Sequence, residues 1–223
     1  MSPRPLGELL SDEDAWPEIE AWAADAENEV VIRPARVEDG ERTLLDLQIT
    51  TRSPMGAVAR HAEGILVDHG WIRVLGAGGP DVRPTLAGLE GTRTDGLARD
   101  DGLLVAHDAI GGFFAVNGGG LPGERGETVF LSPRTLRWHP LEAGYEEWLR
   151  WLFDGDLADF YDGLRWDGWE REAAELTPGD GLHLYPPPWS EEGADVAAAS
   201  RRAVPVTELW ALAQQHRSEL DVE

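Results

Sequence analysis

Two pairs of adjacent aspartate and histidine residues are the parts of this sequence best suited to acid–base chemistry. Asp68-His69 and His107-Asp108 each lie at the end of a predicted strand, beside a turn that contains glycine. Imidazole and carboxylate groups can exchange protons near neutral pH, and the four side chains would converge if the two hairpins are neighbours. Aspartate is also a preferred turn residue, so turn formation is the favoured interpretation and an acid–base site is the alternative.

Three further residues complete the set of candidate partner-contacting or ligand-contacting positions. Arg52 stands among hydroxyl residues before Pro54, where its guanidinium could hold a carboxylate or a phosphate. A bond from Arg52 to a carboxylate of the same surface is the more ordinary interpretation. Trp71 follows the first Asp-His turn, and Asn117 ends the strand that begins at Phe113.

No catalytic motif stands out in the chain. Gly118–Gly123 satisfies the pattern G-x-G-x-x-G, but Pro122 lies inside it and a predicted strand follows instead of a helix. There is no cysteine and no G-x-S-x-G sequence. We therefore expect no cofactor and no catalytic residue that can be named, and a non-enzymatic protein is favoured over an enzyme.

No metal site is favoured, and the alternative that Asp68, Asp108 and their neighbours hold a metal ion stays open. The six histidines have no close pairing of the H-x-x-x-H type. The sequence that starts at Asp154 resembles a calcium loop, but Asp159 and Arg165 stand where glycine and a bidentate glutamate are needed. A junction between two helices, with Asp156 capping the second, explains these acidic residues better.

The candidate residues depend on two predicted hairpins. The central hairpin pairs Leu103–Ala106 with Phe113–Val116 across a polar, glycine-containing connection. The other hairpin pairs Gly64–Val67 with Trp71–Leu75 across Asp68-His69-Gly70. Apolar β-prone runs joined by such turns are typical of an antiparallel sheet.

The remaining elements surround this block of strands. Helices are expected from Pro17, over Glu41–Gln48, from Tyr145, from Leu157 and over Thr207–His216, and further strands over Glu29–Arg33, Ala57–His61, Thr128–Leu131, Leu136–Trp138 and Leu182–Tyr185. The pattern predicts an α+β fold with a central, mostly antiparallel β-sheet flanked by N-terminal and C-terminal helices. We expect one domain over residues 1–223, with a polar lead-in over 1–13 and a frayed tail over 218–223. The long irregular segment 76–101 is expected to be functional or mobile.

Composition limits the range of partners. The 42 acidic residues outnumber 19 basic ones, all of them arginine, and give a formal net charge of −23. This charge disfavours nucleic acid and anionic membranes as partners and favours a basic protein. The absence of a signal-like N-terminus and of a long apolar run predicts a cytoplasmic protein that does not span a membrane. The oligomeric state has no signal in the sequence.

Four blocks of sequence carry a resemblance to a known family. They are Thr50–Val58, Ile65–Gly76, Asp108–Gly119 and Gly163–Trp169. In them the chain resembles the bacterial domain-of-unknown-function family numbered 2625, nearly from end to end, which implies a cytosolic bacterial protein without an assigned activity. The middle of the chain also resembles, more remotely, the SUKH superfamily, many of whose members are immunity proteins that neutralise toxins.

The favoured hypothesis is thus an acidic, non-enzymatic interaction module, including an immunity-type inhibitor of a basic toxin domain. Contacts would come from the sheet-end loops that carry Arg52, Asp68, His69 and Asp108 and from acidic helices. The alternative is a small-molecule-binding protein or an enzyme with a His/Asp site at the same loops.

Overall fold

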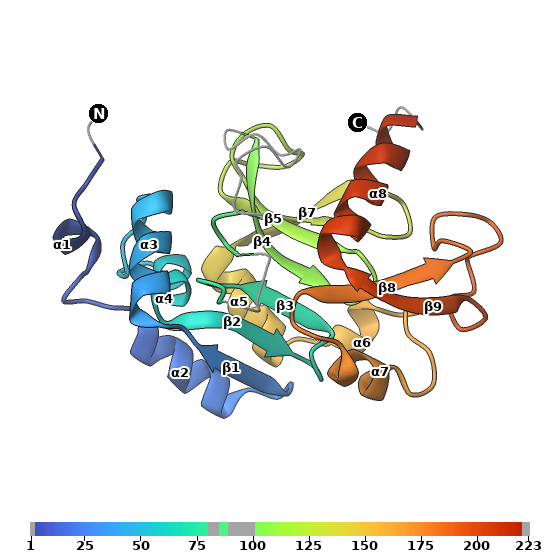
Figure 1. The fold of residues 1–223 in the computed structure, drawn as a ribbon, viewed down its shortest axis with the longest axis horizontal. Helices are drawn as coiled ribbons and strands as arrows, with labels where there is room; N and C mark the ends of the chain where they lie inside the picture. The colour runs from blue at the N-terminus through green and yellow to red at the C-terminus, as the bar shows by residue number, and fades with distance from the viewer. Residues whose placement is uncertain (1–2, 80–84, 89–100, 220–223) are drawn as a thin grey trace.

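The fold is built on one seven-stranded antiparallel sheet. The computed structural model describes residues 3–79, 85–88 and 101–219 (Figure 1). The strands lie in the sheet in the order of the sequence, so each pairs with the next: β1 Val30–Pro34, β2 Ala62–Val67, β3 Ile72–Leu75, β4 Gly102–Asp108, β5 Phe113–Asn117, β6 Glu127–Leu131 and β7 Trp138–Gly144. A second, two-stranded sheet pairs β8 Asp180–Tyr185 with β9 Ser200–Pro205.

Helices precede, follow and cover this sheet. They are α1 Leu6–Leu9, α2 Trp16–Asp25, α3 Val37–Leu47, α4 Pro54–His61, α5 Tyr145–Asp154, α6 Leu157–Phe160, α7 Trp169–Glu175 and α8 Val206–Glu219. The predicted α+β class, with helices at both ends of the chain and a central antiparallel sheet, is confirmed.

The two faces of the sheet bury two different aromatic clusters. Successive side chains of a strand point to opposite faces, so Phe113 and Phe114 of β5 serve opposite layers. Phe114 packs 5.4 Å from Trp148 of α5, whereas Phe113 packs 4.8 Å from Trp210 of α8 (centroid distances). The sheet is therefore the middle of three layers, with α5 behind it and α8 with the β8–β9 ribbon in front of it (Figure 1).

The two predicted hairpins are neighbours in the sheet. In the β3–β4 pairing Ile72 lies opposite Asp108, and Arg73 lies opposite His107. The β2–β3 turn and the β4–β5 turn consequently lie side by side at the same end of the sheet. At the β2–β3 turn, Asp68 and His69 both adopt the left-handed conformation, with φ of 54° and 55°.

Two strand predictions differ from the structure. Leu136–Trp138 overlaps β7 at Trp138 alone, because Leu136 has a left-handed φ of 55° after a turn, and Ala57–His61 is not a strand. Ala57–His61 belongs to α4, which starts at Pro54 after Ser53, whose hydroxyl accepts the Gly56 N–H at 3.1 Å. A short apolar run cannot be assigned to strand or buried helix from periodicity alone. The Ser-Pro start, a favourable N-cap followed by proline in the first turn, is the local signal that decides the case.

The ends of the chain are more structured than expected. Within the predicted polar lead-in, α1 forms one helical turn, and Leu9 is fully buried while its carbonyl accepts the Thr51 N–H at 2.9 Å. At the other end, α8 includes Ser218 and Glu219 of the expected frayed tail. The rest of that tail, and residues 80–84 and 89–100 of the long segment 76–101, lie outside the described residues.

Candidate functional site

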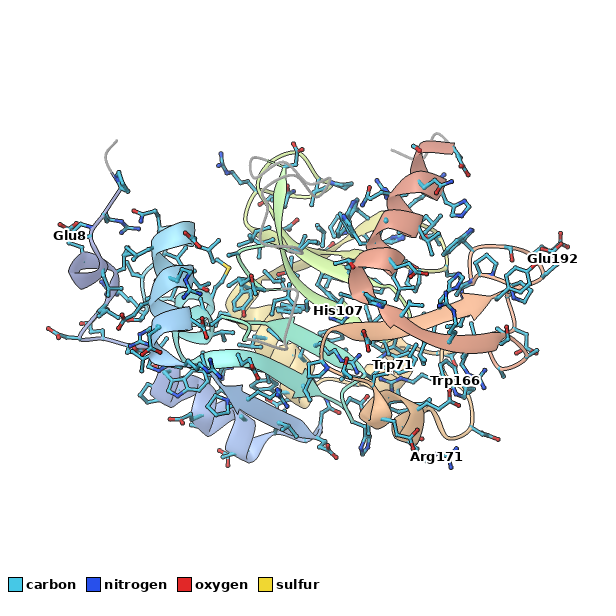
Figure 2. The ribbon with its side chains drawn as sticks, in the orientation of Figure 1. Glu8, Trp71, His107, Trp166, Arg171 and Glu192 are labelled. Carbon is cyan, nitrogen blue, oxygen red and sulfur yellow. The ribbon has the colours of Figure 1, made fainter. Side chains whose placement is uncertain are left out.

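The end of the sheet at which the β2–β3 and β4–β5 turns lie carries a cluster of buried polar and aromatic side chains. We call it the sheet-end cluster, and it consists of Asp68, Trp71, Arg73, His107, Asp108, Tyr161 and Arg165. The segment from α6 to the start of β8 lies against this end: Trp71 contacts Trp166 at 5.7 Å, and both lie near α7 (Figure 2). The cluster therefore lies at one end of the sheet next to this covering segment, with Arg73 and His107 on one face of the sheet and Asp108 on the other.

Asp108 closes the β4–β5 turn. Its Oδ1 accepts the backbone N–H of Ile110 at 2.9 Å and that of Gly112 at 2.6 Å. The carboxyl is fully buried, and burial raises the pKa of Asp108 to about 6, against the opposing effect of these two bonds. Its second oxygen, Oδ2, meets no backbone donor in the described part of the chain, and the side-chain group that interacts with this carboxylate is the Tyr161 hydroxyl. Turn formation, the favoured interpretation for this residue, thus accounts for one of its two oxygens.

His107 is held in one neutral form. Its Nδ1 lies 3.1 Å from the carbonyl oxygen of Asp108, which can only accept, so Nδ1 carries the proton. Burial and, secondly, the charge of Arg73 lower the pKa of His107 to about 3. The ring is consequently uncharged at neutral pH, and Nε2 presents a lone pair that no described donor meets.

Arg73 is a buried cation across the strand pair from His107. Its Nη2 donates to the carbonyl oxygen of Ala173 in α7 at 3.1 Å, while Nε and Nη1 meet no described acceptor. Burial lowers the pKa of Arg73 to about 10, and the carboxylates of Asp108 and Asp180 oppose that effect. Arg73 is therefore charged at neutral pH although the side chain is shielded from water.

Arg165 occupies an aromatic box. Its guanidinium forms an ion pair with Asp68 at 2.5 Å. The same group lies 3.9 Å from the ring centroid of Trp169, 4.8 Å from that of Tyr161 and 5.0 Å from that of Trp71. A cation against aromatic faces and beside a carboxylate is stabilised twice, so this arrangement fixes α6 and α7 on the β2–β3 turn.

The two histidines do not form one acid–base site. His69 is partly exposed, pairs with Glu29 at 3.0 Å and meets the Trp169 ring at 5.9 Å. His107 is in the core and contacts Phe113 at a centroid distance of 6.4 Å. Both Asp-His turns thus lie at one end of the sheet, but their imidazole rings contact different residues.

The other two candidate residues lie elsewhere. Arg52 is exposed and pairs with Glu13 at 3.0 Å, the ordinary interpretation of an arginine in that loop. Asn117 lies opposite Gly102, at the far ends of β4 and β5 from the cluster. Its side chain ties the glycine-rich loop: Oδ1 accepts the Gly119 N–H at 2.7 Å, and Nδ2 donates to the Leu121 carbonyl at 2.9 Å.

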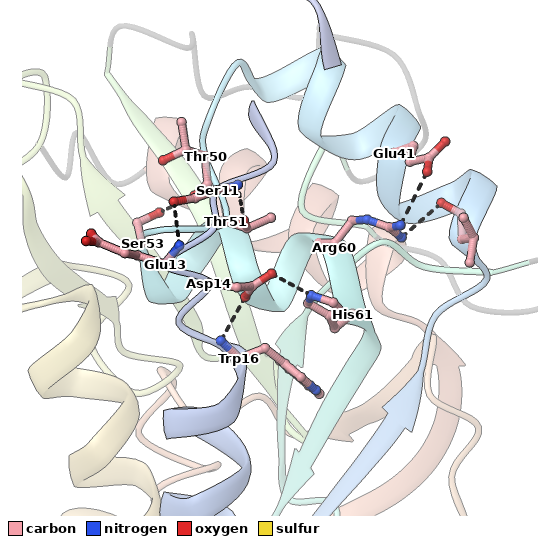
Figure 3. A network of polar contacts seen from close by, with 11 residues as sticks. Ser11, Glu13, Asp14, Trp16, Glu41, Thr50, Thr51, Ser53, Arg60 and His61 are labelled. Atoms are coloured by element: carbon pink, nitrogen blue, oxygen red, sulfur yellow. Dashed lines mark hydrogen bonds and ion pairs between the residues drawn. The ribbon is translucent and has the colours of Figure 1, made fainter. Parts of the chain in front are cut away.

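A second polar network joins the N-terminal segment to the body of the protein (Figure 3). Asp14 accepts the Trp16 N–H at 2.9 Å and pairs with His61 Nε2 at 2.9 Å. The His61 ring stacks on Trp16 at 5.1 Å, and Arg60 pairs with Glu41 of α3 at 3.3 Å. These contacts connect α2, α3 and α4. The polar side chains of this network are paired with one another, so the network has a structural role.

Among the described residues no group of three or more His, Asp or Glu side chains is arranged to hold a metal ion. Asp156 caps α6 by accepting the Asp159 N–H at 2.9 Å, as the helix-junction interpretation predicted.

None of the helices in the described ranges is long and apolar enough to cross a bilayer.

Sequence reasoning missed three members of the sheet-end cluster, Arg73, Tyr161 and Arg165. Arg165 and its partner Asp68 are 97 residues apart, and no local pattern connects them. The sequence of β3 contained one signal for Arg73. It is the single charged residue among apolar neighbours in a strand that is buried throughout.

Comparison with known proteins agrees with the resemblance seen in the sequence blocks. The uncharacterized protein YbfG of Escherichia coli (strain K12) is 37% identical over 224 residues, which cover 95% of this chain and 96% of YbfG. An uncharacterized protein of Haemophilus influenzae is 34% identical, covering 84% of this chain and 83% of its own. No solved structure matches the chain. The bacterial family described as "Protein of unknown function DUF2625" matches residues 6–209, and the chain belongs to that family.

Proposed function

We propose that this chain is a non-enzymatic, acidic protein-interaction module of the bacterial cytoplasm. The observation that carries the proposal is the concentration of exposed carboxylates over residues 145–175, which comprise α5, α6, α7 and the connections between them. This acidic surface comprises Glu146, Glu147, Asp154, Asp156, Asp159, Asp162, Asp167, Glu170 and Glu175. Over the same helices the exposed basic residues are Arg150 and Arg171.

The acidic surface suits a basic protein partner. Carboxylates grouped on one part of a surface attract a positively charged partner over a distance set by the Debye length, about 10 Å at 0.1 M salt. The helices that carry them are anchored firmly, since Trp148 of α5 and Phe160 of α6 both pack on Phe114 of the sheet. A fixed array of charges gives fast association with little ordering of the backbone on binding.

The buried chemistry supports a non-enzymatic role. His107 and Asp108, the residues of the central Asp-His pair, are shielded from solvent and beyond the reach of a macromolecular substrate. The alternative of a His/Asp acid–base site needs His69 and His107 in one place, and their separate partners count against it.

The partner that fits this chemistry best is a basic toxin domain, such as a nuclease, and the role that follows is that of an immunity protein. The remote resemblance of the central hairpin and α5 to the SUKH superfamily motivates this choice. The net charge of −23 is complementary to the positive charge with which a nuclease binds nucleic acid.

Co-expression with a toxin domain encoded beside the gene tests the proposal. We expect the chain to protect cells from that domain and to bind it in solution with an affinity that falls as salt is raised. Failure to protect and to bind would overturn the immunity role. Binding that does not respond to salt would overturn the part assigned to the acidic surface.

A matched pair of variants locates the contact. Asp154→Asn, Asp159→Asn and Asp162→Asn together remove three charges from the acidic surface. Glu191→Gln, Glu192→Gln and Asp195→Asn together remove three from the β8–β9 connection (Figure 2). We expect the first triple variant to lower the association rate about tenfold and the second to leave it within about twofold. Equal effects would contradict a contact on α5–α7.

A further inference from the structure

Buried polar atoms without partners are concentrated in the sheet-end cluster. Among the described residues, eleven buried side-chain nitrogen or oxygen atoms have no hydrogen-bond partner. Seven of them belong to this cluster: Trp71 Nε1, Arg73 Nε and Nη1, His107 Nε2, Asp108 Oδ2, Tyr161 Oη and Arg165 Nε. Native proteins satisfy nearly all such groups, so a concentration of this kind indicates molecules bound between them.

Arg73 is the most demanding of these residues. Arg73 is 3% exposed, and its guanidinium makes one hydrogen bond. Burial removes the water molecules that would accept from its other N–H groups, and this loss is unfavourable unless another acceptor replaces them. The carboxylates of Asp108 and Asp180 offset part of the charge, but neither accepts a hydrogen bond from Arg73. The missing acceptor must therefore come from outside the side chains of the cluster.

The inventory of free groups favours an anion over water. On the face that Arg73 shares with His107, Arg73 Nε and Nη1 can only donate. Trp71 and Arg165 group with Tyr161 near Asp108, which points to the other face, where the Tyr161 hydroxyl can direct its proton toward the Asp108 carboxylate. One acceptor, His107 Nε2, remains for a ligand donor. Water brings equal numbers of donors and acceptors, whereas an oxyanion brings the surplus of acceptors that these donors require.

We propose that Arg73 and His107 form a binding site for a small oxyanion that carries a hydroxyl group, the chemistry shared by hydrogen phosphate and 2-hydroxycarboxylates. Arg73 donates to the anionic oxygens, and the ligand hydroxyl donates to the lone pair of His107 Nε2. Opposite residues of neighbouring strands point to the same face with Cβ atoms about 5 Å apart, so one small ligand can reach both groups.

The covering segment gives this site its access. α7 reaches Arg73 through the Ala173 carbonyl, and Arg165 holds the preceding segment on Asp68. Entry of a ligand requires a shift of this segment, so the site is expected to bind slowly and to exclude large molecules. The inference does not depend on the acidic surface, which lies on the exposed side of α5–α7.

Calorimetric titration of the full-length protein, in a chloride buffer of constant ionic strength, tests the site. The probes are phosphate and glycolate, each paired with an anion that lacks a hydroxyl, sulfate for phosphate and acetate for glycolate. We expect phosphate or glycolate to bind at least tenfold more tightly than its pair, and the preferred pair identifies the source of the oxyanion. No binding of either, or equal affinity within both pairs, would overturn the proposal.

Variants assign the contacts. Arg73→Met should weaken binding of the preferred anion at least tenfold, whereas the control Arg60→Met, which removes a partly buried arginine of α4, should leave affinity unchanged. His107→Phe keeps a ring of similar size and retains Arg73, so it should abolish the preference for the hydroxyl-bearing anion. Unchanged affinity in Arg73→Met would overturn the site. Should Arg73→Met fail to fold, the discrimination measured with wild-type protein and His107→Phe decides the question.

Discussion

His107 and Asp108 are adjacent, fully shielded from water, and shifted in pKa in opposite directions. Burial lowers the pKa of His107 from its ordinary 6.5 to about 3, and raises that of Asp108 from 3.8 to about 6. The unfolded chain therefore binds a proton on His107 that the folded protein rejects, while the folded protein holds a proton on Asp108 that the unfolded chain releases. The two residues have opposite effects on stability in acid.

The sign for each residue follows from linkage. The neutral His107 contributes stability that is complete above pH 6.5 and is lost as the pH falls toward 3. Asp108 gives a contribution that is complete below pH 3.8 and is lost as the pH rises through 6. Between pH 7 and pH 5 the first effect is about 2 kcal/mol and the second about 1 kcal/mol, so acid should destabilise the protein.

We expect the substitution His107→Gln to reduce the loss of unfolding free energy between pH 7 and pH 5, and Asp108→Asn to increase it. Asparagine can still accept the two turn N–H groups through its amide oxygen, so the second variant tests the titration and keeps the turn. Urea unfolding at the two pH values measures both. If all three proteins lost the same free energy, the assignment of these pKa shifts would be wrong.

The contact between α3 and α4 depends on a single glycine. A Cβ atom on Gly40 would lie 2.1 Å from the Arg60 carbonyl oxygen, a backbone atom that a rotamer change cannot move. In an open helix, replacing glycine by alanine stabilises by roughly 0.5–1 kcal/mol, so packing reverses the usual sign here.

We expect Gly40→Ala to lower the free energy of unfolding by about 2 kcal/mol, because the two helices must separate to admit the methyl group. Gly144→Ala is the control: it has an ordinary φ of −71° and no atom within 4 Å of the added carbon. Chemical denaturation should place that variant within about 0.5 kcal/mol of wild type. A Gly40→Ala protein as stable as the control would show that this helix contact yields easily.

Sequence patterns predicted the sheet better than they predicted the candidate site. Both hairpins follow from apolar runs and their turn residues, and these signals are local. The helix α4 was missed because its buried run Ala57–Ala59 has no polar face to show a helical period. Arg73 comes from β3, whereas Tyr161 and Arg165 lie between α6 and α7. Their convergence depends on how α6 and α7 cover the end of the sheet, and no spacing along the chain indicates it.

At the scale of the whole molecule, the excess of carboxylates opposes folding. The chain carries a formal charge of −23, and compact folding brings these charges closer together than they are in the unfolded chain. A few ion pairs act the other way, including Arg165 with Asp68 and Arg33 with Glu63. Among the described residues, the carboxylates of the acidic surface form no ion pair with arginine or histidine, so repulsion should dominate.

Salt should therefore stabilise this protein. Raising sodium chloride from 0.01 M to 0.1 M shortens the Debye length from about 30 Å to about 10 Å, which screens repulsion between exposed carboxylates more than it weakens buried pairs. We expect Tm to rise by about 2–4 °C, equivalent to about 1 kcal/mol for a chain of this size. Thermal unfolding followed by circular dichroism measures the change.

The matched triple variants show where this repulsion arises. If the carboxylates of α5–α7 repel one another more than the average pair does, then Asp154→Asn, Asp159→Asn and Asp162→Asn should raise Tm at 0.01 M salt and reduce its dependence on salt. Glu191→Gln, Glu192→Gln and Asp195→Asn, on the β8–β9 connection, should change both quantities less. Equal changes in the two variants would mean that repulsion is spread evenly over the molecule. The acidic surface would then owe its charge to composition, and a basic partner would have no electrostatic reason to prefer it.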